Sequence, residues 1–341
     1  MGEIVTSVTP LRWRDGLELL DQRLLPDRER WIPVSGAAAA TRLIASLAVR
    51  GAPAIGLVAA YAMAAEAGRN PDLGHLQRAA RRLAAARPTA ANLARAVGEI
   101  LIAVAQAAPD ERFARALAAA RAQHVADAAA CVAMGRHGAA LFPDEGITLL
   151  THCNAGALAT GGIGSALGIV RAVHAAGRLV RLFACEARPV LQGARLTAWE
   201  AVADGIPVTL LADSAAGRLL ASGRVSGVVV GADRIAADGS VANKIGTYPL
   251  AVLAARHGVP FVVAAPTTTF DLNCLDGASI PIEERGAEEV HSVRGRRIAP
   301  AGAEVYNPAF DVTPPELVGA IVSERGVARP VDAVSVRRIA T

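Results

Sequence analysis

The stretch ITLLTHCNAGALATGGIG, Ile147–Gly164, decides the fold of this chain. It begins with a short apolar run, Ile147–His152, and continues through a glycine-rich turn into a helical stretch that extends to about Ala176. Such a run, too short for a helix and bounded by turn residues, is typical of a strand that is buried on both faces. The helix after it would carry the chain back across the sheet to a parallel neighbour.

The same alternation of strand, loop and helix continues toward the C-terminus. Four more apolar runs lie at Leu179–Ala184, Pro207–Ala212, Gly227–Ala232 and Pro260–Ala265, with helical stretches at Gln192–Asp204, Ala215–Ser222 and Ile245–His257 between them. Short buried strands that alternate with helices predict an α/β fold, in which helices cover both faces of a parallel sheet. We expect Pro260–Ala265 to be the last clear strand.

The N-terminal part has a different pattern. Over Ala37–Phe142, alanine-rich segments carry Leu, Ile and Val at three- and four-residue spacing, which predicts a series of helices. Pro88 breaks one helical run, Thr89 can cap the next, and a further helix is expected over Glu111–Leu141. The segment before this region is mixed and predicts a few short strands.

The length of 341 residues favours two domains. The change of pattern places their boundary near Pro143–Gly146. We therefore expect a smaller N-terminal domain of short strands and a helical bundle over residues 1–143. A catalytic domain built on the parallel sheet would span residues 144–341.

Composition narrows the class of protein. Hydrophobic residues make up 52% of the chain and charged residues 19%, so a large core can form and long disordered segments are not expected. The net charge of +4 comes mostly from scattered arginines, without the basic blocks and interleaved aromatic residues typical of nucleic-acid binding. The first residues lack the apolar core of a signal peptide, and no apolar run reaches the ~20 residues of a membrane span. We expect a cytoplasmic protein with neither a nucleic-acid nor a membrane partner.

Polar residues follow each predicted strand. Because the carboxyl ends of parallel strands meet at one edge of the sheet, where ligands bind, we expect these side chains to converge on a site. They are His152, Cys153 and Asn154 after the first strand, Cys185, Glu186 and Arg188 after the second, Asp213 and Ser214 after the third, Asp233 and Arg234 after the fourth, and Pro266 and Thr267–Thr269 after the fifth.

The four cysteines differ in their context. A cysteine near a strand is more often a small buried apolar residue than a reactive one, which is our expectation for Cys131 and Cys274. Cys153 lies in a glycine-rich loop that leads into a helix, and a helix N-terminus lowers the pKa of a thiol. Cys185 stays undecided. No two cysteines have CxxC spacing, so a zinc site is not expected.

Two of the strand-end aspartates also differ. Asp213, with Ser214 after it, immediately precedes a predicted helix and can be simply its N-terminal cap. Asp233 is followed by a long loop, which favours a role beyond capping.

Two glycine-containing segments suggest anion binding. RGAPAIG, Arg50–Gly56, combines an arginine fork with glycine backbone that can approach a phosphate, although alone such a segment is more often a structural turn. ATGGIG, Ala159–Gly164, loosely resembles a dinucleotide fingerprint but lacks the GxGxxG spacing. A tight turn with close backbone packing explains it better, so a dinucleotide-dependent oxidoreductase ranks last.

Eight segments together carry a family resemblance. They follow one another in order and cover nearly the whole chain: VRGAPAIG (Val49–Gly56), ARPTAANL (Ala86–Leu93), THCNAGALATGG (Thr151–Gly162), CEARPVLQGARLTAWE (Cys185–Glu200), GADRIAADGSVANKIGTYPLA (Gly231–Ala251), PFVVAAPTTTFD (Pro260–Asp271), IEER (Ile282–Arg285) and NPAFDVTP (Asn307–Pro314). The set closely resembles the methylthioribose-1-phosphate isomerase family, a relative of the regulatory subunits of translation initiation factor 2B. The initiation-factor relatives generally lack the complete set.

The resemblance implies a Rossmann-like C-terminal domain, a homodimer, and isomerisation of 5-methylthioribose 1-phosphate to 5-methylthioribulose 1-phosphate in methionine salvage. It makes Cys153 and Asp233 the catalytic pair. The matching substrate-binding positions are Arg50, Gly51, Ala52, Arg87, Gln192, Asn243 and Lys244. No metal or redox cofactor is required, because the electrons stay within the sugar.

The chemistry that the resemblance implies needs an acid. Because the C1 oxygen carries a phosphate, the sugar ring cannot open to a free aldehyde. Asp233, with a pKa raised by an apolar surrounding, can protonate the ring oxygen. Cys153 either removes the C2 proton as a thiolate or only assists a hydride shift, while Arg50 and Arg87 hold the phosphate.

Two departures from the family pattern leave the group at C5 open. Ile163 occupies a position where the family usually has Tyr, and the segment PTTTFDL differs from a more common serine-rich form. Both are expected to border the crevice. The alternatives are 5-deoxyribose 1-phosphate, ribose 1,5-bisphosphate with extra basic groups around C5, or a non-catalytic regulatory protein like the initiation-factor subunits.

Overall fold

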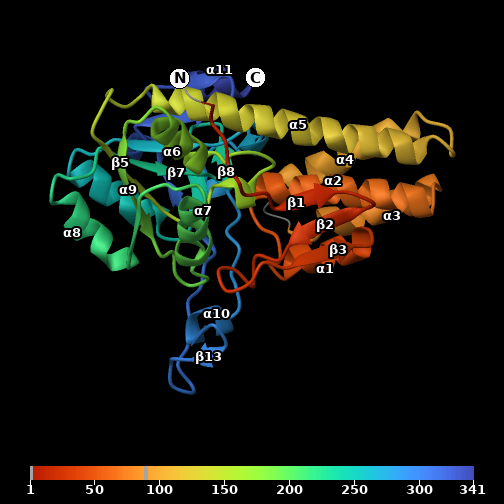
Figure 1. Ribbon diagram of the computed structural model, residues 1–341, viewed down its shortest axis with the longest axis horizontal. Helices are drawn as coiled ribbons and strands as arrows, with labels where there is room; N and C mark the ends of the chain where they lie inside the picture. Colours follow the sequence, from red (N-terminus) through yellow and green to blue (C-terminus); the bar gives the residue numbers. More distant parts are fainter. Residues whose placement is uncertain (1–2, 88–90) are drawn as a thin grey trace.

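A computed structural model describes residues 3–87 and 91–341 (Figure 1). The helix break at Pro88 and the cap at Thr89 lie outside these residues. The N-terminal part opens with a three-stranded antiparallel sheet, followed by helices, as the sequence predicted. Its elements are β1 (Leu11–Trp13), β2 (Leu17–Leu20), β3 (Trp31–Val34), α1 (Ala37–Ala45), α2 (Ala52–Arg69), α3 (Leu73–Ala84), α4 (Ala91–Ala105) and α5 (Arg112–Ala139).

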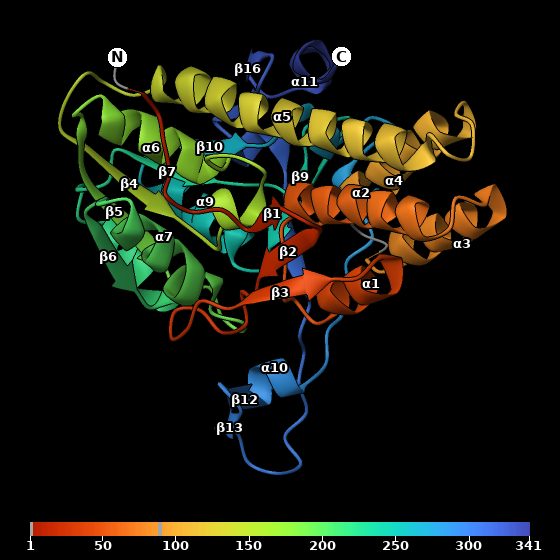
Figure 2. The ribbon, with the colours of Figure 1, turned by 45° about the vertical axis from the view of Figure 1, so that its right-hand side comes forward.

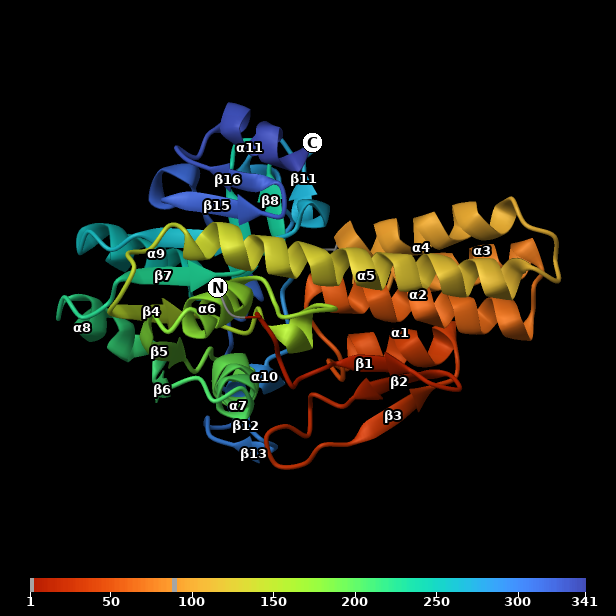
Figure 3. The ribbon, with the colours of Figure 1, turned by 45° about the horizontal axis from the view of Figure 1, so that its top comes forward.

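Helix α2 is the centre of the helical bundle. Nearly its whole length is buried, and it packs against α1, α3, α4 and α5. Its many alanines let neighbouring backbones approach closely, so the bundle is dense without large side chains. The long helix α5 runs from this bundle to the main sheet (Figures 1 and 3). Ala116 and Ala120 belong to the bundle core, whereas Cys131 and Met134 pack into the core beneath the sheet.

The main sheet has seven strands in the order β16-β15-β10-β7-β4-β5-β6. All neighbours pair in parallel except β16, which runs antiparallel to β15. The strands are β4 (Ile147–Thr151), β5 (Leu179–Cys185), β6 (Val208–Leu211), β7 (Gly227–Val230), β10 (Phe261–Ala264), β15 (Ala320–Ser323) and β16 (Gly326–Ala328).

All five predicted strands are therefore confirmed. The expectation that the sheet ends with β10 is wrong, because β15 and β16 extend it. Strand β15 has four residues, as β7 and β10 do, and lies within the apolar run LVGAIV, Leu317–Val322, so the sequence contained a signal for it. Strand β16 has only three residues and gives no such signal.

Helices cover both faces of this sheet. Leu149 and Leu150, adjacent in β4, belong to two different core clusters, one on each face. The predicted helix over Gln192–Asp204 has two parts, a wide π-helical turn at Gly193–Thr197 and then α7. The covering helices are α6 (Ala166–Ala175), α7 (Ala198–Ala203), α8 (Ala216–Leu220), α9 (Thr247–Arg256) and α11 (Ala333–Ala340).

A second, four-stranded sheet lies in the order β11-β8-β9-β14 and was not predicted. Asp233 lies directly before its strand β8, and Asn243 and Lys244 are the last two residues of its strand β9. The strands of this sheet are β8 (Arg234–Ala236), β9 (Val241–Lys244), β11 (Phe270–Asp271) and β14 (Phe310–Thr313). Short 3₁₀ turns lie at Ala157–Ala159, Asp213–Ala215, Thr267–Thr269, Gly277–Ser279 and Pro315–Leu317.

An arm projects from the body of the molecule (Figures 1 and 2). It carries α10 (Glu288–His291) and a small hairpin of β12 (Ser292–Val293) and β13 (Arg296–Arg297). Within the part of the chain that the structure describes, no helix is long and apolar enough to cross a membrane.

Candidate active site

One cavity brings together every catalytic and substrate-binding residue that the family resemblance implied. Of the strand-end residues expected to converge, it is lined by His152, Cys153, Asn154, Asp233 and Pro266. The remaining strand-end residues do not line it: Cys185, Glu186, Arg188, Asp213, Ser214, Arg234 and Thr267–Thr269.

The cavity opens at the carboxyl ends of β4 and β7 and reaches the N-terminus of α2. Cys153 and Asp233 line it, and so do all the predicted substrate-binding residues: Arg50, Gly51, Ala52, Arg87, Gln192, Asn243 and Lys244. These residues come from both halves of the chain, so the site exists only where the bundle meets the sheet.

Cys153 is held in a left-handed backbone conformation, with φ of 61°. That conformation is costly for a residue other than glycine and is found mainly where surrounding contacts enforce it. Here the Thr197 hydroxyl donates to the Cys153 carbonyl oxygen at 2.6 Å, which fixes the turn. The strained turn directs a thiol into the cavity at the end of β4.

Burial raises the pKa of the Cys153 thiol, although the positive charges of Arg50 and Lys244 act in the opposite direction. The expected lowering of this pKa by a helix N-terminus is therefore wrong. Helix α6 begins only at Ala166, and the loss of water around the thiol is the dominant cause of the shift. Burial therefore favours the neutral form of the Cys153 thiol.

Asp233 follows β7, and its backbone N–H donates to the Ala242 carbonyl oxygen at 2.9 Å. Burial raises the pKa of its carboxyl group, and the cations Arg87 and Lys244 only partly offset that effect. The direction agrees with the prediction. A carboxyl group that stays protonated to a higher pH than usual is suited to donate a proton.

Five arginine and lysine side chains line the same cavity, and three of them, Arg50, Arg87 and Lys244, were predicted to bind substrate. Arg50 is oriented by Asn154, to whose side-chain and backbone oxygens it donates at 2.8 and 2.5 Å. Arg87 pairs with Glu283 at 3.2 Å. Burial lowers the pKa of Lys244, while the nearby Cys153 and Asp233 raise it. Such a concentration of positive charge in a recess attracts a small anion.

The N-terminus of α2 adds backbone donors to this anion site. Gly51 precedes the helix with φ of 92°, and a Cβ there would lie 2.5 Å from the Ala159 Cβ. Only glycine allows this close approach. The first residues of this 18-residue helix, Ala52 and Pro53, line the cavity beside Arg50, and the N-terminus of a helix is suited to bind phosphate.

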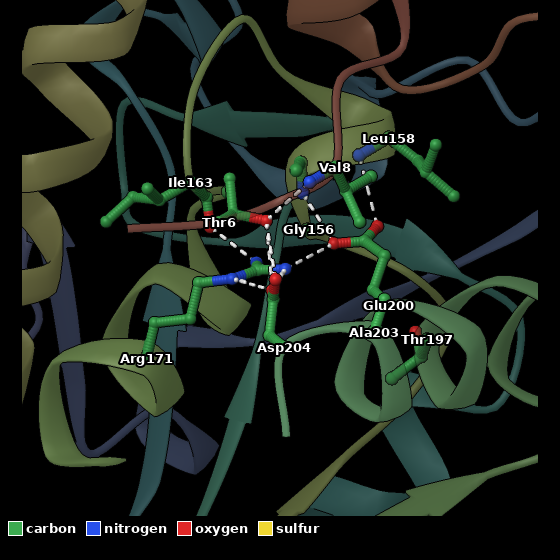
Figure 4. A network of polar contacts seen from close by, with 12 residues as sticks. Thr6, Val8, Gly156, Leu158, Ile163, Arg171, Thr197, Glu200, Ala203 and Asp204 are labelled. Carbon is green, nitrogen blue, oxygen red and sulfur yellow. Dashed lines mark hydrogen bonds and ion pairs between the residues drawn. The ribbon is translucent and has the colours of Figure 1, made fainter. Parts of the chain in front are cut away.

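A buried ionic network supports the loop that carries Cys153 (Figure 4). Arg171 donates to Glu200 at 2.9 Å and to Asp204 at 2.5 Å. Glu200, fully buried, also accepts hydrogen bonds from the backbone N–H groups of Ala157 and Leu158 and from the Asn154 amide. Since Asn154 orients Arg50, the network reaches the anion site.

Asp213 and Cys185 lie outside the cavity, and the contacts of Asp213 show a structural role. Asp213 accepts from the backbone N–H groups of Ala187 and Arg188, both at 2.8 Å, so it fixes the loop after β5 rather than capping its own helix. Burial raises the pKa of Cys185 to about 12. The described residues contain one group with donor atoms close enough for a metal ion, formed by His152, Cys185 and Asp213. That no metal is needed stays a prediction.

The structure corrects one more expectation. Ile163 does not border the cavity but packs in the core between α5 and α6. The glycines around it serve close packing, since a Cβ at Gly162 would lie 2.8 Å from the Ala128 Cα. Of the segment PTTTFDL, only Pro266 lines the cavity.

Sequence reasoning assigned no role to several side chains that line the cavity, among them Gln22, Arg195 and Arg285. The two arginines lie in segments that carry the family resemblance, so their positions were available as a signal. Gln22 lies far from these segments. A lone glutamine in a mixed segment gives no chemical signal.

Comparisons with known proteins identify the family of this chain. The model of the initiation factor 2 subunit family matches residues 48–330. A methylthioribose-1-phosphate isomerase of Anaeromyxobacter sp. (strain K) is 56% identical over 96% of this chain and 95% of its own length. One from Alcanivorax borkumensis is 51% identical over 96% of this chain and 95% of its own.

Solved structures are similar over the whole chain. A crystal structure of 5-methylthioribose 1-phosphate isomerase from Pyrococcus horikoshii OT3 matches with a TM-score of 0.92 and 39% identity, over 99% of this chain and 98% of the other. A structure of the delta subunit of translation initiation factor eIF-2B from A. fulgidus matches with a TM-score of 0.87 and 42% identity, over 98% and 99%. The chain belongs to the initiation factor 2 subunit family and, within it, to the methylthioribose-1-phosphate isomerases.

Proposed function

We propose that this chain isomerises 5-methylthioribose 1-phosphate to 5-methylthioribulose 1-phosphate, a step of methionine salvage. One observation carries the proposal: a buried acid, Asp233, shares a cavity with several cations and a helix N-terminus suited to phosphate. Three of the relatives named above, similar over nearly the full length, are named as isomerases of methylthioribose 1-phosphate.

The reaction follows from the groups in the cavity. Arg50, Arg87 and Lys244 hold the phosphate, with the first amides of α2 beside it. Asp233 donates its proton to the ring oxygen as the bond between that oxygen and C1 breaks. A hydrogen moves from C2 to C1, and the C2 hydroxyl loses its proton to become the ketone. The carboxylate left on Asp233 can accept that proton, which returns the site to its starting state.

The neutral thiol of Cys153 favours transfer of the hydrogen as hydride. A thiol with a raised pKa is a poor base in the resting site, and the burial of the thiol disfavours exchange with water. We expect substrate deuterated at C2 to yield product with nearly all of the deuterium at C1, measured by NMR. Washout of the label into solvent would instead make Cys153 the base that removes a proton.

A regulatory, non-catalytic protein is the competing hypothesis, because an initiation-factor structure is nearly as similar. Comparison of kcat/KM for methylthioribose 1-phosphate, 5-deoxyribose 1-phosphate and ribose 1,5-bisphosphate separates the alternatives. We expect the methylthio sugar to give the highest value without added cofactor. Absence of turnover with all three sugars would support the regulatory alternative.

We further propose that the protein acts as a cytoplasmic homodimer and that residues 1–143 and 144–341 form separate domains. The family resemblance supports the dimer. One core cluster is drawn entirely from residues 11–120, which supports the division into domains. Helix α5 crosses between the two parts and would keep their relative position fixed.

A further inference from the structure

Three of the residues that line the cavity each have a buried polar side-chain atom without a hydrogen-bond partner among the described residues. These atoms are the Gln192 Oε1, the Arg87 Nε and the Gln22 Oε1. Buried polar groups without partners are rare in folded proteins, and each one requires an explanation. Gln192 and Arg87 match substrate-binding positions, so a bound substrate can supply their partners. Gln22, just after β2, has the same feature and so far no role.

The orientation of the Gln22 amide is set by the backbone of the loop opposite. Its Nε2 donates to the Leu158 carbonyl oxygen at 2.8 Å. The reverse orientation would place two acceptors against each other, so the oxygen must be the atom without a partner.

The main chain of Gln22 is equally constrained. Its N–H donates to the Ala48 carbonyl oxygen at 2.9 Å, and Arg195 donates to its carbonyl oxygen at 3.0 Å. With only 1% of its surface exposed, Gln22 presents an acceptor in a fixed direction. An acceptor fixed in advance loses little conformational entropy when a ligand binds.

We propose that Gln22 is a substrate-binding residue whose Oε1 accepts a hydrogen bond from a ring hydroxyl of the sugar 1-phosphate. The inference rests on the proposed function. An amide oxygen can only accept, so the ligand must supply a donor. In methylthioribose 1-phosphate the phosphate, ring oxygen and thioether offer acceptors, which leaves the C2 and C3 hydroxyls as the donors.

This assignment gives the N-terminal part of the chain a role in recognition beyond phosphate binding. The phosphate is held by cations and helix amides at one part of the cavity, and Gln22 fixes the rotation of the sugar relative to it. A sugar that lacks the partner hydroxyl would leave Oε1 buried and unpaired, and sites built to bind a hydroxyl reject such analogues.

The test combines a protein change with a substrate change. Gln22→Met removes the acceptor at similar size, and we expect it to lower kcat/KM for the parent sugar by about tenfold. The variant and the wild type are then compared with two analogues of the sugar. For the 3-deoxy sugar the measurement is kcat/KM. The 2-deoxy sugar cannot react, so its inhibition constant is measured instead. With the analogue that lacks the partner hydroxyl, the penalty should shrink toward onefold. Gln22→Glu, which keeps an acceptor oxygen, should retain the dependence on that hydroxyl and replaces Gln22→Met if the latter does not fold.

Asn92 offers a matched control. It is also a buried amide whose nitrogen has a partner, the Thr268 hydroxyl at 2.9 Å, and whose oxygen has none, but it does not line the cavity. Asn92→Leu should change all three measurements by the same factor. An equal penalty of Gln22→Met with all three sugars would overturn the proposal, because a purely structural role acts on each alike. Absence of wild-type turnover would instead refute the proposed function, and the role of Gln22 with it.

Discussion

Asp233→Asn lowers kcat by about 10²–10⁴-fold, the contribution of a positioned general acid. Asparagine has nearly the same shape, so the cavity stays intact while the transferable proton is lost. The ring oxygen must then leave without protonation, which is the difficult part of the reaction for a sugar blocked at C1. The measurement is the rate of ketose formation at saturating substrate, with thermal unfolding to confirm that the variant is folded.

Asp311 provides the control for this substitution. Burial raises the pKa of Asp311 to about 6, and its carboxylate accepts from the backbone N–H groups of Gly246 and Tyr248, outside the cavity. Asp311→Asn should keep kcat close to the parent value. Full activity of Asp233→Asn would remove that residue from the mechanism.

The pH profile gives a second readout of the same acid. Since burial raises the pKa of Asp233, the protonated form persists above the range of an ordinary aspartate. Activity is then present below this raised pKa and falls as the pH rises through it. The residual activity of Asp233→Asn should lack this alkaline decline.

Arg171→Met destabilises the protein by about 3–5 kcal/mol, because it leaves Glu200 and Asp204 buried without their cation. All three side chains are nearly inaccessible to water, with 2%, 0% and 8% of their side-chain surfaces exposed. The free energy of unfolding, measured in urea, reports the loss. KM for the sugar 1-phosphate should also rise, since the network orients Arg50 through Asn154.

Arg95 and Glu99 form the contrasting pair, one helical turn apart on α4 with more than two fifths of each side chain exposed. Arg95→Met should change the stability by about 0.3–0.5 kcal/mol. If Arg171→Met cost no more than Arg95→Met, the buried network would have no special part in holding the catalytic loop.

Much of the fold could be predicted because local pattern decides it. The apolar runs that became β4, β5, β6, β7 and β10 are bounded by turn residues, and the alanine-rich stretches have helical spacing. The strands of the second sheet were missed because β8, β9, β11 and β14 have two to four residues each and pair across the chain. Their stability comes from tertiary contacts, which a local pattern does not contain.

The site was predictable only in part for the same reason. Strand ends placed Cys153 and Asp233 at one edge, and the resemblance supplied their chemistry. The direction of the pKa shift of Cys153 was wrong because sequence shows the neighbouring helix but not the loss of water around the thiol. The link from Arg171 through Glu200 and Asn154 to Arg50 joins four segments, and no spacing in the sequence reveals it.

The most direct test of the central claim follows the C2 carbon of the substrate by NMR. Purified full-length protein is incubated with 5-methylthioribose 1-phosphate labelled with ¹³C at C2, without added metal or nucleotide. The account predicts that the alcohol signal of C2 is replaced by a ketone signal while the phosphate remains on C1. An unchanged C2 signal with folded protein, for this sugar and for 5-deoxyribose 1-phosphate, would contradict it.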